Sequence, residues 1–465
     1  MTDQMPAVGE VPITSSLGRL VVATTVLGSA VAMLTATVVN VALPTIAADL
    51  DASSSAQQWV INAYLLTISA LILIGGTLGD RYGRIRVYRI GIIWFALASL
   101  ACAVAPNIET LIVARLLQGV GGALLTPGSL AIIEATLRKD DRGLGVGRWS
   151  GLIGVAGAVG PLVGGILVDW SWRYVFVVNI PVAVAVLAMS TRLPESSDGD
   201  ATRTPLDILG ATLTILALGG ASYGLIEGPN QGWTGLVVAA IVVSIVSLVA
   251  LIVVEPGRPG AIVPIDLFAN RTFAAANLVT FLVYGGMGVV FFLIPIQLQV
   301  TAGFSPLAAG ASFLPSTALM MLLSSRAGDT AQRIGPRLPL TIGPLMIAAG
   351  LLLFTRIGPG ADYVSDVLPA VLLFGLGLAA SVAPVTATAL GSVPSHRSGA
   401  ASGANNAISR TGQLLTIAAI PPIVGLTGTA LSDPVRLDAG FGQAMVVGAA
   451  LVAAGAAVSA WLLRP

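Results

Sequence analysis

The stretch that decides the fold runs from Trp59 to Arg86 and reads WVINAYLLTISALILIGGTLGDRYGRIR. Its first part is apolar over about 20 residues, which is long enough for one α-helix to cross roughly 30 Å of hydrocarbon. Its last part is a glycine-rich turn with one Asp and several Arg residues. The stretch therefore predicts a membrane-spanning helix that ends in a tight, basic turn.

Apolar segments of similar length recur along the chain from Leu20 to Leu463. Of the 465 residues, 55% are hydrophobic and 10% are charged, and the mean hydropathy is +0.91. A soluble domain carries roughly 25% charged residues, so this composition predicts an all-α integral membrane protein. We expect about fourteen transmembrane helices, at 17–43, 55–79, 87–105, 108–135, 143–168, 173–192, 205–226, 232–256, 271–298, 306–329, 336–356, 365–390, 398–426 and 439–463.

The positions of the basic residues predict the topology. If both termini are inside, Arg81, Arg84, Arg86 and Arg89 share one cytoplasmic loop. Anionic lipid and the insertion machinery retain such loops in the cytoplasm. We therefore expect a multi-pass protein of the inner (plasma) membrane with both termini cytoplasmic, and the polar first residues do not read as a cleaved signal.

A weak internal repeat indicates two halves. The turn from Gly76 to Gly83 recurs with the same glycine spacing from Gly328 to Gly335, 252 residues later. This offset corresponds to about eight helices, so two helices are inserted between two pseudo-symmetric six-helix bundles that are able to rock about a central site. The expected parts are a cytoplasmic tail 1–16, a bundle 17–192, a linker 193–204, an inserted pair 205–256, a linker 257–270 and a bundle 271–465.

The glycine-rich turn also contains candidate functional residues. Its Asp and Arg side chains are able to cap helix ends and form ion pairs at the cytoplasmic face, whereas a simple topology anchor needs no Asp. The residues are Gly76, Asp80, Arg81, Gly83 and Arg84. This turn resembles the signature of the major facilitator superfamily, and the resemblance extends over the whole chain. It implies a conformational latch between the halves.

The fourth predicted helix contains RLLQGVGGALLTPG, with Arg115 about two turns inside the membrane. An intramembrane Arg costs at least ~2.5 kcal/mol on insertion scales, so we expect it to face the bundle interior. The alternative is an Arg that extends to the outer headgroups. Arg115, Gln118 and Gly119 resemble a family motif that implies proton coupling.

The fifth predicted helix reads GVAGAVGPLVGGIL, with small residues at steps of three to four. This spacing forms a smooth face for close helix packing, and Pro161 is a possible kink. The residues are Gly154, Gly157, Gly160, Pro161, Gly164 and Gly165. Ordinary helix packing is one interpretation; the other is that the segment resembles the antiporter motif of drug exporters in this superfamily.

Four further segments narrow the resemblance to the fourteen-helix drug:proton antiporter family, a group of multidrug efflux transporters. They are WVINAYLL from Trp59, WRYVFVVNIP from Trp172, SPLAAGASFLP from Ser305 and RSGAASGANNAISRTG from Arg397.

One position departs from that family. The first helix reads LTATVVNVALP from Leu34, and Thr35 stands where the family resemblance implies an Asp that binds a cation or a proton. Thr does not titrate near neutral pH, so the usual coupling carboxylate is missing. Glu134 and Asp207 are the alternative proton carriers, although both are expected near the inner ends of helices, where each is equally explained as a solvated acid.

Polar or large residues in the middle of predicted helices are candidates for lining a substrate cavity, although any one of them is also explained by helix packing. They are Thr35, Asn40, Tyr64, Gln118, Tyr284, Phe291, Asn405 and Asn406.

These observations predict a secondary transporter that exports small amphipathic molecules by alternating access, with proton-coupled antiport implied by the family resemblance. No GxxxxGK[ST] loop, metal cluster or nucleophile motif is present in the sequence, so we expect no enzyme activity, no cofactor and no nucleic-acid partner. The expected partners are a small-molecule substrate, protons and the lipid bilayer, and the protein is expected to be a monomer. A transport-inactive receptor or scaffold and a differently coupled metabolite transporter are the alternatives.

Overall fold

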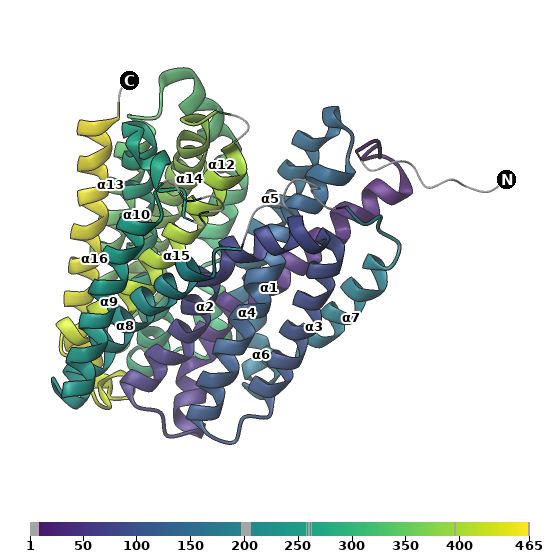
Figure 1. Ribbon diagram of the computed structural model, residues 1–465. Helices are drawn as coiled ribbons and strands as arrows, with labels where there is room; N and C mark the ends of the chain where they lie inside the picture. The colour runs from purple at the N-terminus through teal and green to yellow at the C-terminus, as the bar shows by residue number, and fades with distance from the viewer. Residues whose placement is uncertain are drawn as a thin grey trace.

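The computed structural model describes residues 9–196, 206–256, 258, 261, 263–394 and 397–463. These residues are helical and contain no β-strand, and one isolated bridge pairs Val11 with Leu137. The first helix begins and the last helix ends at the same end of the molecule, which we call the termini end (Figure 1). The expectation of an all-helical protein is confirmed.

The helices fall into an N-terminal group, a middle pair and a C-terminal group (Figure 1). The N-terminal group comprises α1 (Ser16–Asp49), α2 (Ser54–Tyr82), α3 (Arg84–Ala103), α4 (Ile108–Thr136), α5 (Lys139–Val168), α6 (Tyr174–Val177) and α7 (Asn179–Ser190). The middle pair is α8 (Ile208–Gln231) and α9 (Gly235–Val254). The C-terminal group comprises η2 (Ile265–Ala269), α10 (Arg271–Ile296), η3 (Gln297–Thr301), α11 (Pro306–Ala311), α12 (Leu314–Ile334), α13 (Pro339–Phe354), η4 (Tyr363–Val367), α14 (Leu368–Gly391), α15 (Ser398–Ile423), η6 (Ala430–Ser432) and α16 (Pro434–Leu462).

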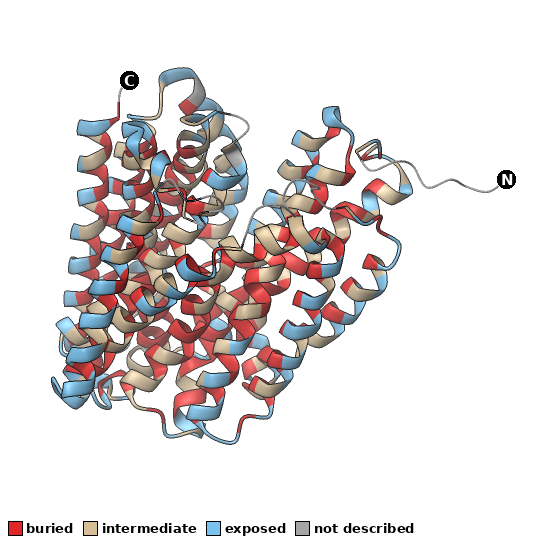
Figure 2. Cartoon of the chain, in the orientation of Figure 1, coloured by how far each residue is buried: buried red, intermediate tan, exposed pale blue. Residues whose placement is uncertain are grey.

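Eleven helical stretches of the described chain are long and apolar enough to cross a membrane. Two further apolar stretches, Tyr174–Ser190 and Pro339–Phe354, are shorter, and α15 is long but rich in polar residues. The same fourteen segments were expected from the sequence. The most apolar of them is α9, in which a stretch of 18 residues has a mean hydropathy of 3.2. Only 22% of this stretch is buried, as expected for a helix surrounded by lipid. Figure 2 shows similar exposed outer faces on the other peripheral helices.

Some helix boundaries differ from the expected ranges. The expected helix 173–192 is divided between α6 and α7, and the expected helix 306–329 is divided between α11 and α12. Pro315 stands at the start of α12, where its missing N–H costs nothing, so the proline begins a new helix. Conversely, α1 continues through Pro44 to Asp49, because prolines are tolerated within membrane helices whose neighbours supply compensating contacts.

The two ends of the internal repeat have the same local conformation. Gly83 follows α2 with a φ of 104°, and Gly335 follows α12 with a φ of 83°. Both angles lie in the region that glycine adopts without steric cost, so the matching glycines of the sequence terminate matching helices.

The N-terminal and C-terminal groups contact each other mainly away from the termini end. Helix α2 packs on α15, and α5 packs on α11 and α12. Toward the termini end, the ribbons of α5 and α12 diverge (Figure 1). The middle helix α8 packs on α9 and also on α2 and α15, so it lies along the boundary between the two groups.

Candidate functional site

Arg115 lies in the second turn of α4 and is 1% exposed. Its Nε donates to the Val60 carbonyl oxygen at 2.9 Å, and its Nη1 donates to Oε1 of Gln118 at 2.6 Å. The guanidinium also lies 4.5 Å from the centre of the Tyr64 ring, in a cation–π contact. Every one of these partners is neutral, so the positive charge of Arg115 is solvated by the protein but not balanced.

A chain of side-chain hydrogen bonds connects Arg115 to Thr35. Gln118 donates from Nε2 to Oγ of Ser99 at 2.7 Å, and Asn179 donates from Nδ2 to the same oxygen at 3.2 Å. Thr35 then donates from Oγ1 to Oδ1 of Asn179 at 3.0 Å. The chain therefore joins α4, α3, α7 and α1, and two of the expected cavity residues, Thr35 and Gln118, are buried members of this network. Sequence reasoning did not single out Ser99 or Asn179, although Asn179 belongs to the WRYVFVVNIP segment.

A small cavity of about 30 Å³ adjoins Arg115 between the N-terminal and C-terminal groups. Residues from α1, α2, α4, α10 and α15 line it, so its shape depends on how the groups meet. The lining residues are Ala36, Asn40, Ile61, Tyr64, Leu65, Arg115, Gly288, Phe291, Gln413 and Ile417. Three of the expected cavity residues, Asn40, Tyr64 and Phe291, are among them.

One face of α15 extends this cavity toward the termini end. Asn406, Arg410, Gln413 and Ile417 recur at helical spacing and share that face. Asn406 is exposed, Arg410 and Gln413 are intermediate and Ile417 is buried, so exposure decreases toward the contact between the groups. Arg410 lies within electrostatic range of Tyr64 and Tyr284, and sequence reasoning did not select it.

Asn405 has a different environment from its neighbour Asn406. Its Nδ2 donates to Oδ1 of Asn277 at 3.0 Å and to Oγ1 of Thr280 at 2.9 Å, both on α10. Asn405 therefore connects two helices of the C-terminal group, away from the face that carries Arg410.

The glycines of α5 bring this helix into close contact with α1 and α11. A Cβ atom at Gly160 would lie 2.0 Å from Oγ1 of Thr37, and one at Gly165 would lie 2.6 Å from Cα of Leu307. Likewise, a Cβ atom at Gly310 of α11 would lie 2.0 Å from the carbonyl oxygen of Pro161. Gly157 and Gly164 also approach α1, whereas a methyl group at Gly154 would have no neighbour within 4 Å. Gly165 and Pro161 therefore form the close contact between the two groups, whereas Gly157, Gly160 and Gly164 pack within the N-terminal group.

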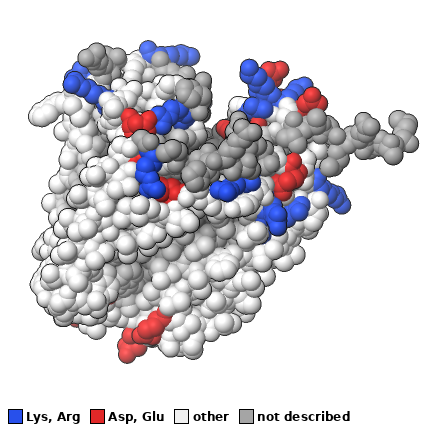
Figure 3. Space-filling model, in the orientation of Figure 1, with Lys and Arg blue, Asp and Glu red and all other residues white. Residues whose placement is uncertain are grey.

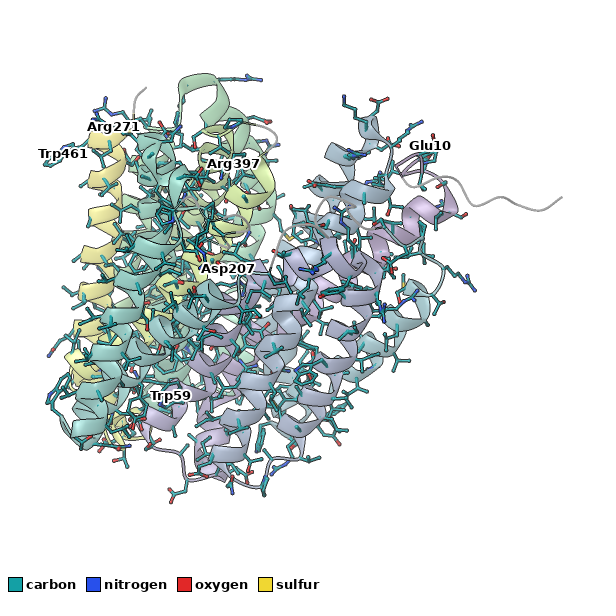
Figure 4. The ribbon with its side chains drawn as sticks, viewed as in Figure 1. Glu10, Trp59, Asp207, Arg271, Arg397 and Trp461 are labelled. Atoms are coloured by element: carbon teal, nitrogen blue, oxygen red, sulfur yellow. The ribbon has the colours of Figure 1, made fainter. Side chains whose placement is uncertain are left out.

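The acidic candidates lie away from Arg115. Glu134 is exposed in the last turn of α4. Asp207 caps the start of α8 and forms a 3.5 Å ion pair with Arg258. Figure 4 shows Asp207 at a level between Arg397, near the termini end, and Trp59, near the opposite end.

Glu255, at the end of α9, faces Asp207 and was not selected from the sequence. A Cβ atom at Gly210 would lie 2.0 Å from Oε1 of Glu255 and 2.3 Å from Oδ2 of Asp207, so the two carboxyl groups meet over this glycine. Glu255 is 1% exposed. Burial, together with the adjacent Asp207 carboxyl, raises the pKa of Glu255 to about 7.

The glycine-rich turn forms an ion pair and a helix cap within the N-terminal group. Arg84 and Asp80 pair at 2.8 Å, and Glu195 accepts hydrogen bonds from the backbone N–H groups of Ile85 and Arg86, each at 2.9 Å. A Cβ atom at Gly83 would lie 2.9 Å from the Glu195 carboxyl carbon. The turn therefore packs against Glu195 in the segment that follows α7. Gly76 lies near Pro127 of α4.

Comparison with known proteins assigns this architecture. The profile of the Major Facilitator Superfamily matches residues 25–417. The chain belongs to the major facilitator superfamily.

Relatives within the superfamily agree over nearly the whole length. A methylenomycin A resistance protein of Bacillus subtilis is 34% identical over 426 residues, which cover 90% of each chain. A puromycin resistance protein of Streptomyces alboniger is 35% identical, over 86% of this chain and 81% of that protein. Among solved structures, a D-xylose–proton symporter has a TM-score of 0.63 at 16% identity, with 97% of this chain and 98% of that chain covered. The family assignment indicates a transporter rather than an enzyme, and the solved structure shares its fold.

Proposed function

We propose that this protein exports small amphipathic molecules, including antibiotics and other drugs, by alternating access. The observation that carries the proposal is the asymmetric contact between the two helix groups. They meet through Gly165, Gly310 and Pro161, while toward the termini end the α15 face from Ile417 to Asn406 becomes progressively exposed. A central site that is closed at one end and open at the other is what alternating access requires.

The direction of opening depends on topology, for which we propose cytoplasmic termini in the plasma membrane. On the face shown in Figure 3, basic and acidic side chains gather toward the termini end and a broad uncharged belt lies below them. Basic residues remain preferentially on the cytoplasmic side of a membrane. The structure then corresponds to a state open to the cytoplasm, the side from which an exporter takes its substrate.

The moving parts are proposed to be the bundles 17–192 and 271–465, with 205–256 as an inserted pair. All fourteen helical segments are proposed to span the bilayer, and a single chain is sufficient because the central cavity is lined by both groups of one molecule. The names of the curated relatives, which are resistance proteins for methylenomycin A and puromycin, support export of such compounds.

We propose proton antiport as the coupling, with Asp207 and Glu255 as the exchanging carboxyl groups. Thr35 provides no acid near Arg115, whereas this pair is buried, and the pKa of Glu255 is raised to about 7 by its burial and by the adjacent Asp207 carboxyl. A carboxyl group that titrates near neutral pH is able to exchange a proton at each change of state. Arg115 is proposed to hold in place the hydrogen-bond network that joins α4 to α3, α7 and α1. Glu134 remains the alternative exchanging acid.

The test is proton movement in inverted vesicles that contain the full chain, followed with a pH-sensitive dye while antibiotics and dyes are added. Drug-dependent proton release from the vesicles is expected. Asp207→Asn and Glu255→Gln should abolish it and Glu134→Gln should leave it intact, whereas the opposite pattern would identify Glu134 as the exchanging acid. Drug flux without proton movement would overturn the coupling but leave export standing. Absence of flux for every compound would overturn export and favour a receptor or scaffold with this fold.

A further inference from the structure

Among the described residues, two arginines at the centre of the molecule form no ion pair with an acid. Arg115 is 1% exposed, and its hydrogen bonds go to a backbone carbonyl and to the Gln118 amide. Arg410 is half-buried, and the groups within its electrostatic range are the Tyr64 and Tyr284 side chains. In the part of the chain that the structure describes, the five ion pairs involve other arginines.

The two guanidinium groups both interact with the side chain of Tyr64. Tyr64 stacks beneath Arg115 and is also within electrostatic range of Arg410. Its hydroxyl donates to the Ala32 carbonyl oxygen at 3.0 Å, so the ring is fixed in place. Two positive charges therefore act on one rigid residue at the boundary between the helix groups.

An unbalanced cation in a region of low dielectric constant is costly, and it is retained in membrane proteins where it faces a partner that arrives with the opposite charge. Arg410 lies where such a partner is able to reach it. It is on the α15 face between exposed Asn406 and the cavity residue Gln413, and Tyr284 and Phe291 provide aromatic surface on α10. The arrangement combines a charged anchor with an apolar wall.

We propose that the central site selects amphipathic anions, and that Arg410 binds the anionic group of the substrate. This inference rests on the proposed export function and specifies its substrate class. Arg115, which is buried against the Tyr64 ring, contributes positive potential, while Arg410 makes the direct contact. Cationic compounds are disfavoured, because the first helix has Thr35 in place of a carboxylate and both central charges are positive.

The test uses the full chain purified in neutral detergent and two fluorescent probes with the same aromatic frame. One is 8-anilinonaphthalene-1-sulfonate, an amphipathic anion, and the other is N-phenyl-1-naphthylamine, which lacks the sulfonate and is neutral. After subtraction of binding to detergent alone, the wild-type protein should bind the sulfonate at least about tenfold more tightly than the neutral probe. This ratio corresponds to the free energy of one hydrogen bond to a charged group.

Arg410→Gln should remove this preference, and Arg410→Lys should retain part of it because the charge remains. Arg436→Gln is the matched control, since Arg436 is exposed at the start of α16 and donates to the Thr427 carbonyl oxygen. Equal binding of the two probes by the wild-type protein, or an unchanged preference in Arg410→Gln, would overturn the anion site. The wild-type comparison requires no variant, so it decides the question even if a substitution prevents folding.

Failure of the anion site and failure of the export function give different results. If inverted vesicles transport neutral or cationic compounds but show no preference for anions, the export function stands. Only the role of Arg410 as the anion-binding residue is then refuted.

Discussion

The Thr35 hydroxyl donates a 3.0 Å hydrogen bond to the Asn179 amide oxygen, and both residues are buried. Asn179 in turn donates to Ser99, which also accepts from Gln118, the hydrogen-bond partner of Arg115. The position where family resemblance implies an acid is thus occupied by a hydroxyl whose hydrogen bond is satisfied. The network is complete without a carboxylate.

Removal of that hydroxyl should destabilise the N-terminal group. Thr35→Val preserves the shape of the side chain but leaves the Asn179 amide oxygen buried without its donor, which costs about 1–3 kcal/mol. A lower midpoint of thermal unfolding in detergent is the expected result. Thr35→Ser retains the donor and should unfold near the wild-type temperature; equal stability of the Val and Ser variants would contradict the role of the hydrogen bond.

Contact between α5 and α11 should depend on Gly165. In Gly165→Ala, the new methyl group would lie 2.6 Å from Cα of Leu307, so backbone must move, at a cost of about 1–3 kcal/mol to the state in which this end is closed. Reduced export is expected, together with a larger distance between spin labels placed on α5 and α11. Gly154→Ala is the control on the same helix, because nothing lies within 4 Å of its methyl position. Equal loss in both variants would show that the effect is not steric.

Stability should vary with pH through Glu255. Its pKa is raised from 4.5 to about 7, so the folded protein binds more protons than the unfolded chain between these values. The contribution of Glu255 is therefore fully present below about pH 4.5 and is lost as pH rises through about 7. Glu255→Gln, which remains neutral, should flatten the decline in thermal stability across this window. Asp207→Asn should reduce the decline as well, and an unchanged pH profile in Glu255→Gln would refute the raised pKa.

Glu195 should stabilise the start of α3. Glu195→Ala frees the backbone N–H groups of Ile85 and Arg86 and is expected to cost about 1 kcal/mol, as for the loss of a helix cap. Faster hydrogen exchange at those two amides is the direct measurement. Glu10→Ala serves as a control, because Glu10 is exposed and lies outside the helices. Unchanged exchange in Glu195→Ala would contradict the cap.

The sequence was sufficient for the helices but not for their side-chain contacts. Hydrophobic length predicted the helices, and equal glycine spacing predicted equivalent turns after two of them, where Gly83 and Gly335 both have positive φ angles. The network from Arg115 to Thr35 joins residues up to 144 positions apart, and no local pattern marks such a pairing. Glu255 was similarly hidden near the end of the expected helix 232–256, because its burial depends on how α8 and α9 pack. The break between α6 and α7 falls at Val178, directly before Asn179 and close to Pro181, whereas the expected helix 173–192 was drawn through both of these residues.

The unbalanced charge of Arg115 and Arg410 has an energetic consequence for export. If the substrate supplies the missing negative charge, each molecule that leaves the cell transfers one negative charge outward across a membrane whose interior is negative. The electrical potential then contributes about 2.3 kcal/mol per 100 mV to every export event. Proton entry adds to this term in the same direction. The membrane potential thus helps to drive the export of an anionic cargo, whereas it would oppose the export of a cationic one.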